Sequence, residues 1–255
     1  MSTLSRSLTR MIKNLIAALD AADDMPEAVR LRTASYDLLH AGPGSSIVDV
    51  GCGTGRAVAE LAGRGVHATG VDPNEQMIAV ARDRAPEADF RIASAEALPL
   101  PDASVNGYRA DKVFHELPDP AKALAEARRV LTPGGRIVLL GQDWDTFVID
   151  SDTPSLTRTI VHARADLVTS PRAARRYRNL LLDAGFHDVR SEVRTGVFTD
   201  ASLSPLLTGL AEAARTTGAI TAAQADAWIA DQHARAATDR LYLALPIFIT
   251  SATAP

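Results

Sequence analysis

The chain has a single cysteine, Cys52, among its 255 residues, so no disulfide can form within it. A reducing compartment is the natural setting for such a chain, and we expect a cytoplasmic protein. No base stands near Cys52 in the sequence, and a nucleophilic role for its thiol is therefore not expected. Although 46% of the residues are hydrophobic, no apolar run approaches the roughly 18 residues that a membrane helix needs. We therefore expect no membrane span.

Blocks of like charge and clusters of metal ligands are also missing. The net charge is −4 and is spread along the chain, which argues against nucleic acid as the default partner. The histidines show no metal-ligand spacing with one another or with acids, so we expect no metal ion. The length allows one large domain or a domain with a small appendage. Together these features are typical of a soluble enzyme.

What the sequence does contain is a glycine-rich loop after an apolar run. Residues 47–56 read Ile-Val-Asp-Val-Gly-Cys-Gly-Thr-Gly-Arg. Glycines at that spacing let the backbone turn sharply and approach a ligand closely. A dinucleotide-binding loop would need G-x-G-x-x-G, and its last glycine would fall at Arg56 or Val58, so that match fails. The acid before the glycines would repel a pyrophosphate and suit a positively charged ligand. The candidate binding residues are Asp49, Gly51, Gly53 and Gly55.

A second apolar run, residues 66–71, ends in another acid, Asp72. A carboxylate at the end of the second strand can accept hydrogen bonds from both hydroxyls of a ribose. Pro73 and Met77 follow at the start of a helix and provide apolar surface next to this acid. This second segment therefore predicts the nucleoside end of the ligand.

The loop resembles motif I of the class I S-adenosylmethionine-dependent methyltransferases, and three later segments fall where that family places its landmarks. Residues 90–102 resemble the segment G-D-A-E-x-L-P-F, residues 114–117 stand where many relatives read L-H-H-L, and residues 131–138 resemble the turn L-x-P-G-G. Together the motifs cover residues 46 to about 143. The resemblance is to the small-molecule methyltransferases of the ubiquinone/menaquinone-biosynthesis type, and it implies S-adenosylmethionine as the cofactor.

The resemblance also implies roles for individual residues. The first acid would lie near the positive charges of S-adenosylmethionine, and the second would hold its ribose. The carbonyl of Ala110 would face the methionine ammonium. Ser94 replaces the family's acid at the adenine amino group, which predicts a weaker, uncharged contact. The cofactor's carboxylate needs a cation, which Arg30 or Arg32 could supply, with Arg56 as a weaker choice. The remaining cofactor-binding candidates are Gly51, Gly53, Gly55, Pro73, Met77, Ala95 and Glu96.

Strand and helix signals alternate along the chain, which predicts an α/β fold with a doubly wound, mostly parallel sheet. The resemblance implies a seven-stranded, Rossmann-like methyltransferase fold whose last strand is antiparallel. A helix is expected from about Pro171, with Ser170 as its cap and Gly185 at its end. Strands are expected near 46–49, 67–71, 89–93, 105–110, 135–142, 188–198 and 241–249, and the other helices of the core near 56–64, 74–84 and 121–130.

Residues 1–40 are predicted to form an N-terminal helical cap on a methyltransferase domain that spans residues 41–255. Asp24 and Glu27 predict a capping box at the start of the second helix of this cap. The preferred interpretation places the cap over the cofactor. Because residues 1–19 are basic and lack acids, a transit peptide or a helix on a membrane surface is the alternative. The apolar stripe of the first helix consists of Leu8, Met11, Ile12, Leu15, Ile16 and Leu19.

About 40 residues separate the last two expected strands, where the family can manage with a tight hairpin. Residues 200–239 read as two helices, the first with a leucine stripe over residues 203–210. The second begins with a capping box of Thr221 and Gln224 and carries Trp228. Ligands of such sheets bind outside the carboxyl ends of the strands, so we interpret this insertion as a substrate lid. A dimer interface, which would imply a homodimer, or additional core is the alternative.

Methyl transfer from a sulfonium is an in-line displacement, in which alignment and water exclusion supply much of the catalysis. A base is needed only where the acceptor must lose a proton. His115 is the natural base because its ordinary pKa lies near neutrality, and Asp111 is the second candidate. Packing is the alternative role for His115, and a solvated face is the alternative for Asp111 and for the basic segment 172–178. The acceptor-binding candidates are Tyr108, Trp144, Arg176, Tyr177 and Leu207.

The sequence therefore predicts a methyltransferase that acts on the oxygen or carbon of a small apolar or aromatic metabolite. Two alternatives stay open. One is a catalyst that uses the sulfonium only as a fixed positive charge and transfers no methyl group. The other is a non-catalytic partner protein that binds S-adenosylmethionine.

Overall fold

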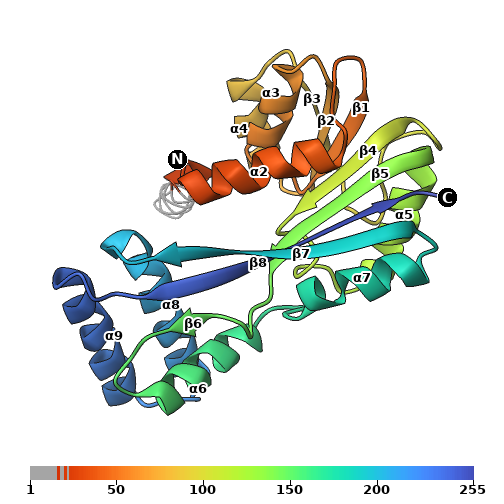
Figure 1. Cartoon of the computed structure of the whole chain (residues 1–255). Helices are drawn as coiled ribbons and strands as arrows, with labels where there is room; N and C mark the ends of the chain where they lie inside the picture. Colours follow the sequence, from red (N-terminus) through yellow and green to blue (C-terminus); the bar gives the residue numbers. More distant parts are fainter. Residues whose placement is uncertain (1–15, 18–19, 22) are drawn as a thin grey trace, which may run out of the picture. The chain divides into compact units, whose positions relative to one another are not determined.

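The computed structural model describes residues 16–17, 20–21 and 23–255 (Figure 1). The predicted apolar stripe over residues 8–19 falls outside these residues, apart from Ile16. The chain forms two compact units. Unit 1 comprises the described residues up to Arg109 together with Arg129–Ile137, and unit 2 comprises Ala110–Arg128 with Val138–Pro255. Within the described ranges, no helix is long and apolar enough to cross a membrane.

The strands follow the order β3-β2-β1-β4-β5-β8-β6, and β7 pairs with β8 beside this path. β1, β2 and β3 pair in parallel, whereas β6 and β7 both run antiparallel to β8. The prediction of a doubly wound, mostly parallel Rossmann-like sheet is confirmed, with one short additional strand, β6. The bounds are Ser46–Val50 (β1), His67–Asp72 (β2), Asp89–Ile92 (β3), Val105–Asp111 (β4), Leu131–Gln142 (β5), Val148–Ile149 (β6), His187–Phe198 (β7) and Leu243–Thr253 (β8).

Unit 1 contains the helices α2 (Pro26–Leu38), α3 (Arg56–Ala62) and α4 (Glu75–Arg84). The last four residues of β1 are all buried, which is the pattern of a parallel strand covered on both faces. α4 is capped by Asn74, whose side chain accepts hydrogen bonds from the N–H groups of Gln76 and Met77.

The predicted capping box at the start of α2 is wrong. The cap residue is Met25, which makes no side-chain hydrogen bond, and Pro26 begins the helix. A proline in the first turn sets a helix start by itself because its φ is already helical and its missing N–H is not needed there. Glu27 instead accepts a hydrogen bond from Arg30, one turn further along.

Unit 2 carries most of the remaining helices. Their bounds are Pro120–Val130 (α5), Pro154–Ala165 (α6), Ala173–Asp183 (α7), Ser204–Thr216 (α8) and Ala222–Ala237 (α9), with a 3-10 turn over Ala201–Leu203. The sequence did not predict α6. It predicted α7 with the wrong cap, because Arg172 precedes the helix and Ser170 donates its hydroxyl to the carbonyl of Leu117.

Residues 200–239 pack with α6 into a helical core, and their role as a substrate lid stays a prediction. Figure 1 shows α6, α8 and α9 grouped together, and Leu207, Leu210 and Trp228 lie in one buried cluster that includes residues of α6. Each of the three is 1% exposed. The side chain of Leu207 is enclosed by other apolar side chains, and its contact with an acceptor stays a prediction. The capping box of Thr221 and Gln224 is confirmed.

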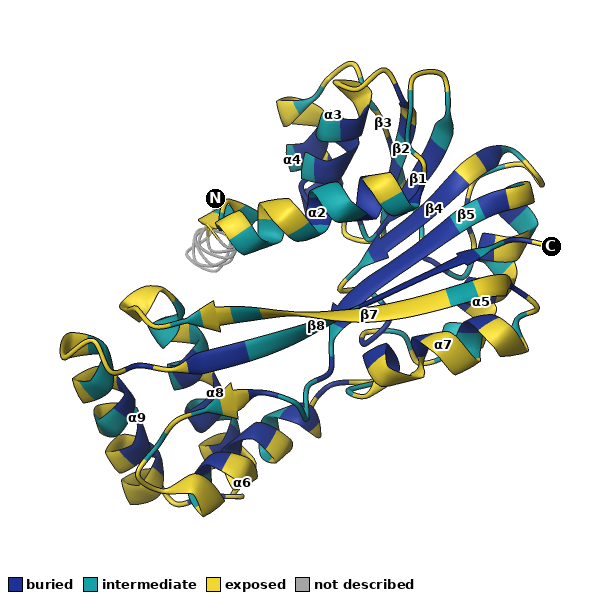
Figure 2. Ribbon diagram, in the orientation of Figure 1, coloured by how far each residue is buried: buried dark blue, intermediate teal, exposed yellow. Residues whose placement is uncertain are grey.

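β7 differs from the other long strands in its exposure. Figure 2 shows β4 and β5 mostly buried and β7 exposed along most of its length. Among the described strands only β8 pairs with β7. Its exposed charges, Arg190, Glu192 and Arg194, are of the kind that discourages edge-to-edge association. The homodimer that one interpretation of the insertion implies remains a prediction.

Candidate functional site

The glycine loop connects β1 to α3 in unit 1. Gly51, Gly53 and Gly55 have φ angles of 67°, 53° and 83°, which side-chain-bearing residues rarely adopt. At Gly55 a Cβ would also lie 2.6 Å from the ring of Phe90. The loop therefore needs glycine for its turns, as the sequence predicted, and at Gly55 also for close packing against Phe90, which the sequence did not predict.

Asp72, at the end of β2, is tied directly to this loop. Its Oδ2 accepts a hydrogen bond from the Gly53 N–H at 3.0 Å, and its Oδ1 accepts one from the Asn74 N–H at 2.8 Å. A carboxylate offers about four acceptor positions, so two backbone donors fix its orientation and leave capacity for hydroxyl donors. This geometry suits the predicted contact with a ribose.

The other predicted cofactor contacts of unit 1 lie along the next segments of the chain. Met77 and Ala95 are buried, Glu96 is half-buried, and Pro73 and Ser94 are exposed. Ala110, which belongs to unit 2, is 1% exposed at the end of β4. Their contacts with a cofactor stay predictions.

Cys52 is buried inside the glycine loop. Burial, assisted by the nearby charges of Asp49 and Asp72, raises the pKa of its thiol far above the ordinary value. A thiol that stays protonated is a poor nucleophile. The structure thus agrees with the expectation that Cys52 is a small residue fitted into the loop.

Asp49 has a buried partner that the sequence analysis missed. Arg109 Nη1 donates to Asp49 Oδ1 at 2.8 Å, and both side chains are 3% exposed. The carboxylate therefore does not present a lone negative charge to a ligand. The sequence contains a pattern that could have predicted this ion pair. Arg109 lies inside the otherwise uncharged segment 105–110, and a buried arginine requires an acid nearby.

Arg32, which the sequence predicted at the cofactor carboxylate, has partners within unit 1. Its Nε and Nη2 donate to the Glu60 carboxylate, and its Nη1 donates to the Asp23 carbonyl. The residue is 6% exposed, so these contacts hold its guanidinium in the interior. Arg56, the weaker choice, pairs with Asp24 at 2.7 Å.

His115 follows β4 in unit 2 and is 6% exposed. Its Nε2 lies 3.1 Å from Glu116 Oε1, and within the described part of the chain its Nδ1 has no hydrogen-bond partner. Burial lowers the pKa of His115, and the opposing effect of Glu116 is smaller. The imidazole is therefore neutral at pH 7 and can accept a proton.

Gln142 Oε1 and Trp144 Nε1 are also among the buried polar atoms that lack a hydrogen-bond partner within the described residues. The Trp144 ring packs against His115, with 5.7 Å between centroids, and stacks on Phe147 at 5.5 Å. Arg164 lies over the same indole, 4.5 Å from its centre. Buried polar atoms are normally paired, so the unpaired Trp144 Nε1, on a ring that packs against His115, is a candidate for contact with a ligand. The sequence predicted His115 and Trp144 but not Gln142.

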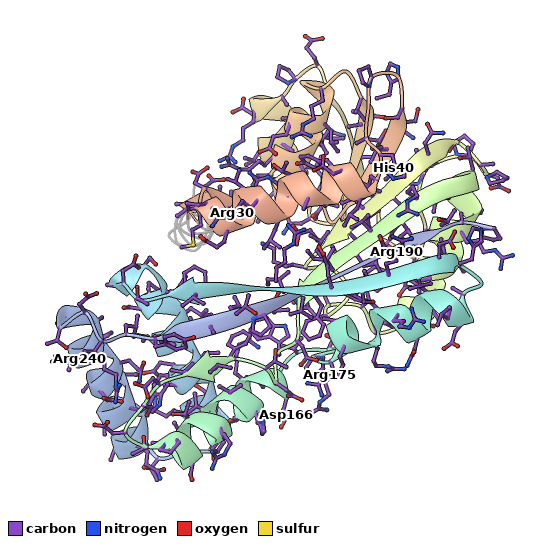
Figure 3. All side chains as sticks on the ribbon, in the orientation of Figure 1. Arg30, His40, Asp166, Arg175, Arg190 and Arg240 are labelled. Carbon is purple, nitrogen blue, oxygen red and sulfur yellow. The ribbon has the colours of Figure 1, made fainter. Side chains whose placement is uncertain are left out.

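The arginines of the basic segment 172–178 mostly have internal partners. Arg175, labelled on α7 in Figure 3, forms an ion pair with the fully buried carboxylate of Asp143. Arg172 pairs with Asp145, and Arg178 donates to the Val189 carbonyl. Arg176 is exposed, and its contact with an acceptor stays a prediction.

The acceptor contact of Tyr177 stays a prediction, and the structure shows the residue held in the interior. The residue is 1% exposed, its hydroxyl donates to the Leu140 carbonyl at 3.2 Å, and its ring packs edge-on against Phe114. Tyr108 is fully buried on β4, and Asp111 is half-buried at the end of the same strand. The roles predicted for Tyr108 and Asp111 are not tested by this geometry.

Comparisons with known proteins agree with the fold and the glycine loop. A family model described as a methyltransferase domain matches residues 48–139. An O-methyltransferase of Penicillium expansum, cnsE, is 34% identical over 165 residues, which cover 59% of this chain and 57% of that protein. A demethylmenaquinone methyltransferase of Renibacterium salmoninarum is 31% identical over 140 residues, which cover 54% of this chain and 59% of that protein.

An uncharacterized protein of a Streptomyces fradiae transposon matches over a longer range. It is 34% identical over 227 residues, which cover 84% of this chain and 65% of that protein. The chain thus spans between about 57% and 65% of the length of these three relatives. Among solved structures, a putative methyltransferase of Bacillus halodurans has a TM-score of 0.61 at 18% identity, covering 88% of this chain and 98% of that one.

The comparisons therefore show similarity to a methyltransferase domain over residues 48–139 and a fold shared with solved methyltransferase structures.

Removal of the Asp72 carboxylate is expected to weaken cofactor binding. An Asp72→Ala variant loses charged hydrogen bonds worth about 1.5–3 kcal/mol, so its Kd for S-adenosylhomocysteine should rise at least tenfold. Ser94→Ala should raise this Kd by a smaller factor, because only a neutral hydrogen bond is lost. Calorimetric titration of both variants measures the difference. Unchanged affinity in Asp72→Ala would contradict the assignment of the ribose contact.

Proposed function

We propose that the protein catalyses methyl transfer from S-adenosylmethionine to an oxygen or carbon atom of a small aromatic or apolar metabolite. The observation that carries the acceptor assignment is the neutral, buried His115, whose Nδ1 has no partner among the described residues. A methyltransferase whose acceptor is already nucleophilic has no need of such a base. A phenol or an acidic carbon does need one, because it must lose a proton before or during transfer.

In this proposal each group of residues has a distinct task. The glycine loop and Asp72 bind the nucleoside and methionine parts of the cofactor. His115 accepts the proton of the acceptor, and Trp144 provides an aromatic wall next to it, with ring centroids 5.7 Å apart. Gln142 Oε1 and Trp144 Nε1 offer one hydrogen-bond acceptor and one donor to polar groups of the substrate.

Two named relatives support the choice of acceptor class. The Penicillium protein is an O-methyltransferase, and the Renibacterium protein acts on demethylmenaquinone, according to their names. Both names are consistent with methylation of a small organic molecule. They do not decide between oxygen and carbon, and the proposal covers both.

The test is product formation with a panel of acceptors. Phenols, hydroquinones and small 1,3-dicarbonyl compounds should give S-adenosylhomocysteine and a product heavier by one methyl group, while aliphatic amines of similar size should not. A [4+2]-cyclase, SpnF, shares the fold with a TM-score of 0.54 at 23% identity. Conversion of an acceptor without formation of S-adenosylhomocysteine would favour a catalyst that transfers no methyl group. Turnover of amines alone would contradict the assigned base.

A further inference from the structure

Arg109 is a buried cation on β4 for which the proposed mechanism has no use. Its guanidinium stays charged, since arginine is not deprotonated in proteins. Nη1 donates to Asp49 Oδ1 at 2.8 Å, and Nε donates to Ser35 Oγ at 2.8 Å. The same guanidinium lies 5.8 Å from the centre of the Tyr36 ring. One buried charge thus contacts both β1 and α2.

This contact decides the state of Asp49. The Asp49 side chain is 3% exposed, and an isolated carboxylate buried to that degree would take up a proton. With Arg109 at hydrogen-bond distance the ionised form is stabilised and its orientation is fixed. Asp49 stands two residues before Gly51, the first glycine of the loop. The arginine therefore sets both the charge and the direction of the acid that begins the cofactor loop.

Ser35 completes the arrangement from α2. The residue is fully buried, and its hydroxyl donates to the Arg32 carbonyl at 2.6 Å while it accepts from Arg109. A hydroxyl used in both directions leaves the guanidinium little freedom to rotate. A lysine would keep the charge of Arg109 but could not donate to Asp49 and Ser35 in the same fixed geometry.

We propose that Arg109 is a positioning residue for S-adenosylmethionine, which holds Asp49 ionised and oriented at the start of the glycine loop. The inference rests on the proposed function for the identity of the ligand. It alters the role expected for Asp49, because the acid acts as half of a balanced pair and not as a net negative charge that attracts the cofactor.

A double-mutant cycle tests this inference with S-adenosylhomocysteine as the probe. Arg109→Gln and Asp49→Asn should each raise the calorimetric Kd at least about tenfold. The double variant should bind no more than about threefold more weakly than Asp49→Asn, because Arg109 acts through Asp49. Arg109→Lys should be intermediate. The double variant leaves no lone buried charge, so it also serves where a single variant does not fold.

Glu60→Gln is the matched control. It disrupts the ion pair between Arg32 of α2 and Glu60 of α3, in which the Arg32 side chain is 7% exposed. Its Kd should stay within about threefold of the wild type. Equal weakening by Glu60→Gln and Arg109→Gln would show that general packing of α2 is the cause and would overturn the inference.

Two other results would also overturn the inference. One is a double variant whose Kd rises by the product of the two single-variant increases. The other is an Arg109→Gln protein whose affinity for S-adenosylhomocysteine is unchanged. A wild-type protein that fails to bind S-adenosylhomocysteine would instead contradict the proposed function. The two failures are therefore distinguishable.

Discussion

A His115→Ala variant should lose about 10²–10⁴-fold in kcat while its affinity for S-adenosylmethionine stays close to that of the wild type. The reason is that the imidazole is buried and neutral, with Nδ1 unpaired among the described residues, so its removal takes away a proton acceptor. Steady-state kinetics with a phenolic acceptor, together with calorimetry of the cofactor, separate the two effects.

The pH dependence gives a second readout for the same residue. Burial places the pKa of His115 below its ordinary value of about 6.5, with Glu116 opposing and Lys112 and Arg164 assisting the shift. The base must be neutral to act, so the rate should be level from pH 7 to 8 and fall on acidification below about 6.5. This acidic limb should vanish in His115→Ala.

Glu116→Gln is the control for His115. The Glu116 side chain is 68% exposed, and its contact with His115 is screened by solvent. We therefore expect kcat of Glu116→Gln to differ from that of the wild type by only a few fold. If kcat of His115→Ala also fell by only a few fold, the result would favour the packing role of the imidazole. Alignment of acceptor and cofactor would then be the main source of rate.

The largest expected effect on stability is that of Trp228→Ala. Trp228 is 1% exposed at the centre of the cluster formed by α6, α8 and α9, and its indole N–H donates to Thr157 Oγ1 at 2.9 Å. Removal of so large a buried side chain leaves a cavity and should cost about 3–5 kcal/mol. Chemical denaturation, monitored by the helical signal in circular dichroism, measures the change in the free energy of unfolding.

Two controls accompany the Trp228 substitution. Trp228→Phe keeps an aromatic ring and loses mainly the hydrogen bond, so the free energy of unfolding should fall by about 1 kcal/mol. Leu182→Ala removes an apolar side chain from the surface of α7, where Leu182 is 45% exposed. This substitution should change the free energy of unfolding by less than about 0.5 kcal/mol. If Trp228→Ala were as mild as Leu182→Ala, the three helices would not share a core.

The features that the sequence predicted well are local ones. The turn from β1 through three glycines into α3, and the acid at the end of β2, depend on residues that are neighbours in the chain. Backbone conformation and strand direction are enough to place them. The capping box of α9 was predictable for the same reason, since Thr221 and Gln224 lie within one turn.

The features that the sequence missed are pairings between distant residues. Arg109 lies 60 positions from Asp49, and Arg32 lies 28 positions from Glu60. Ser170 was assigned to the start of α7, but its hydroxyl reaches the Leu117 carbonyl, 53 positions away. Local patterns report which groups need partners, and the tertiary fold decides which partners they receive.

The leucine stripe of α8 shows the same limit. Its spacing correctly predicted an amphipathic helix with one face to bury. It could not reveal that α6, which no pattern indicated, supplies part of the surface against which that face packs. Without α6, a pocket roof and a helical core were equally compatible with the stripe.

Calorimetric titration of the wild-type protein with S-adenosylmethionine, and in parallel with NAD, tests the central claim most directly. The three left-handed glycines and the backbone-anchored carboxylate of Asp72 predict saturable binding of S-adenosylmethionine at one site per chain. They predict no binding of NAD, because the loop lacks the G-x-G-x-x-G spacing of dinucleotide-binding loops. Tight binding of NAD, or no heat of binding with S-adenosylmethionine, would contradict the account.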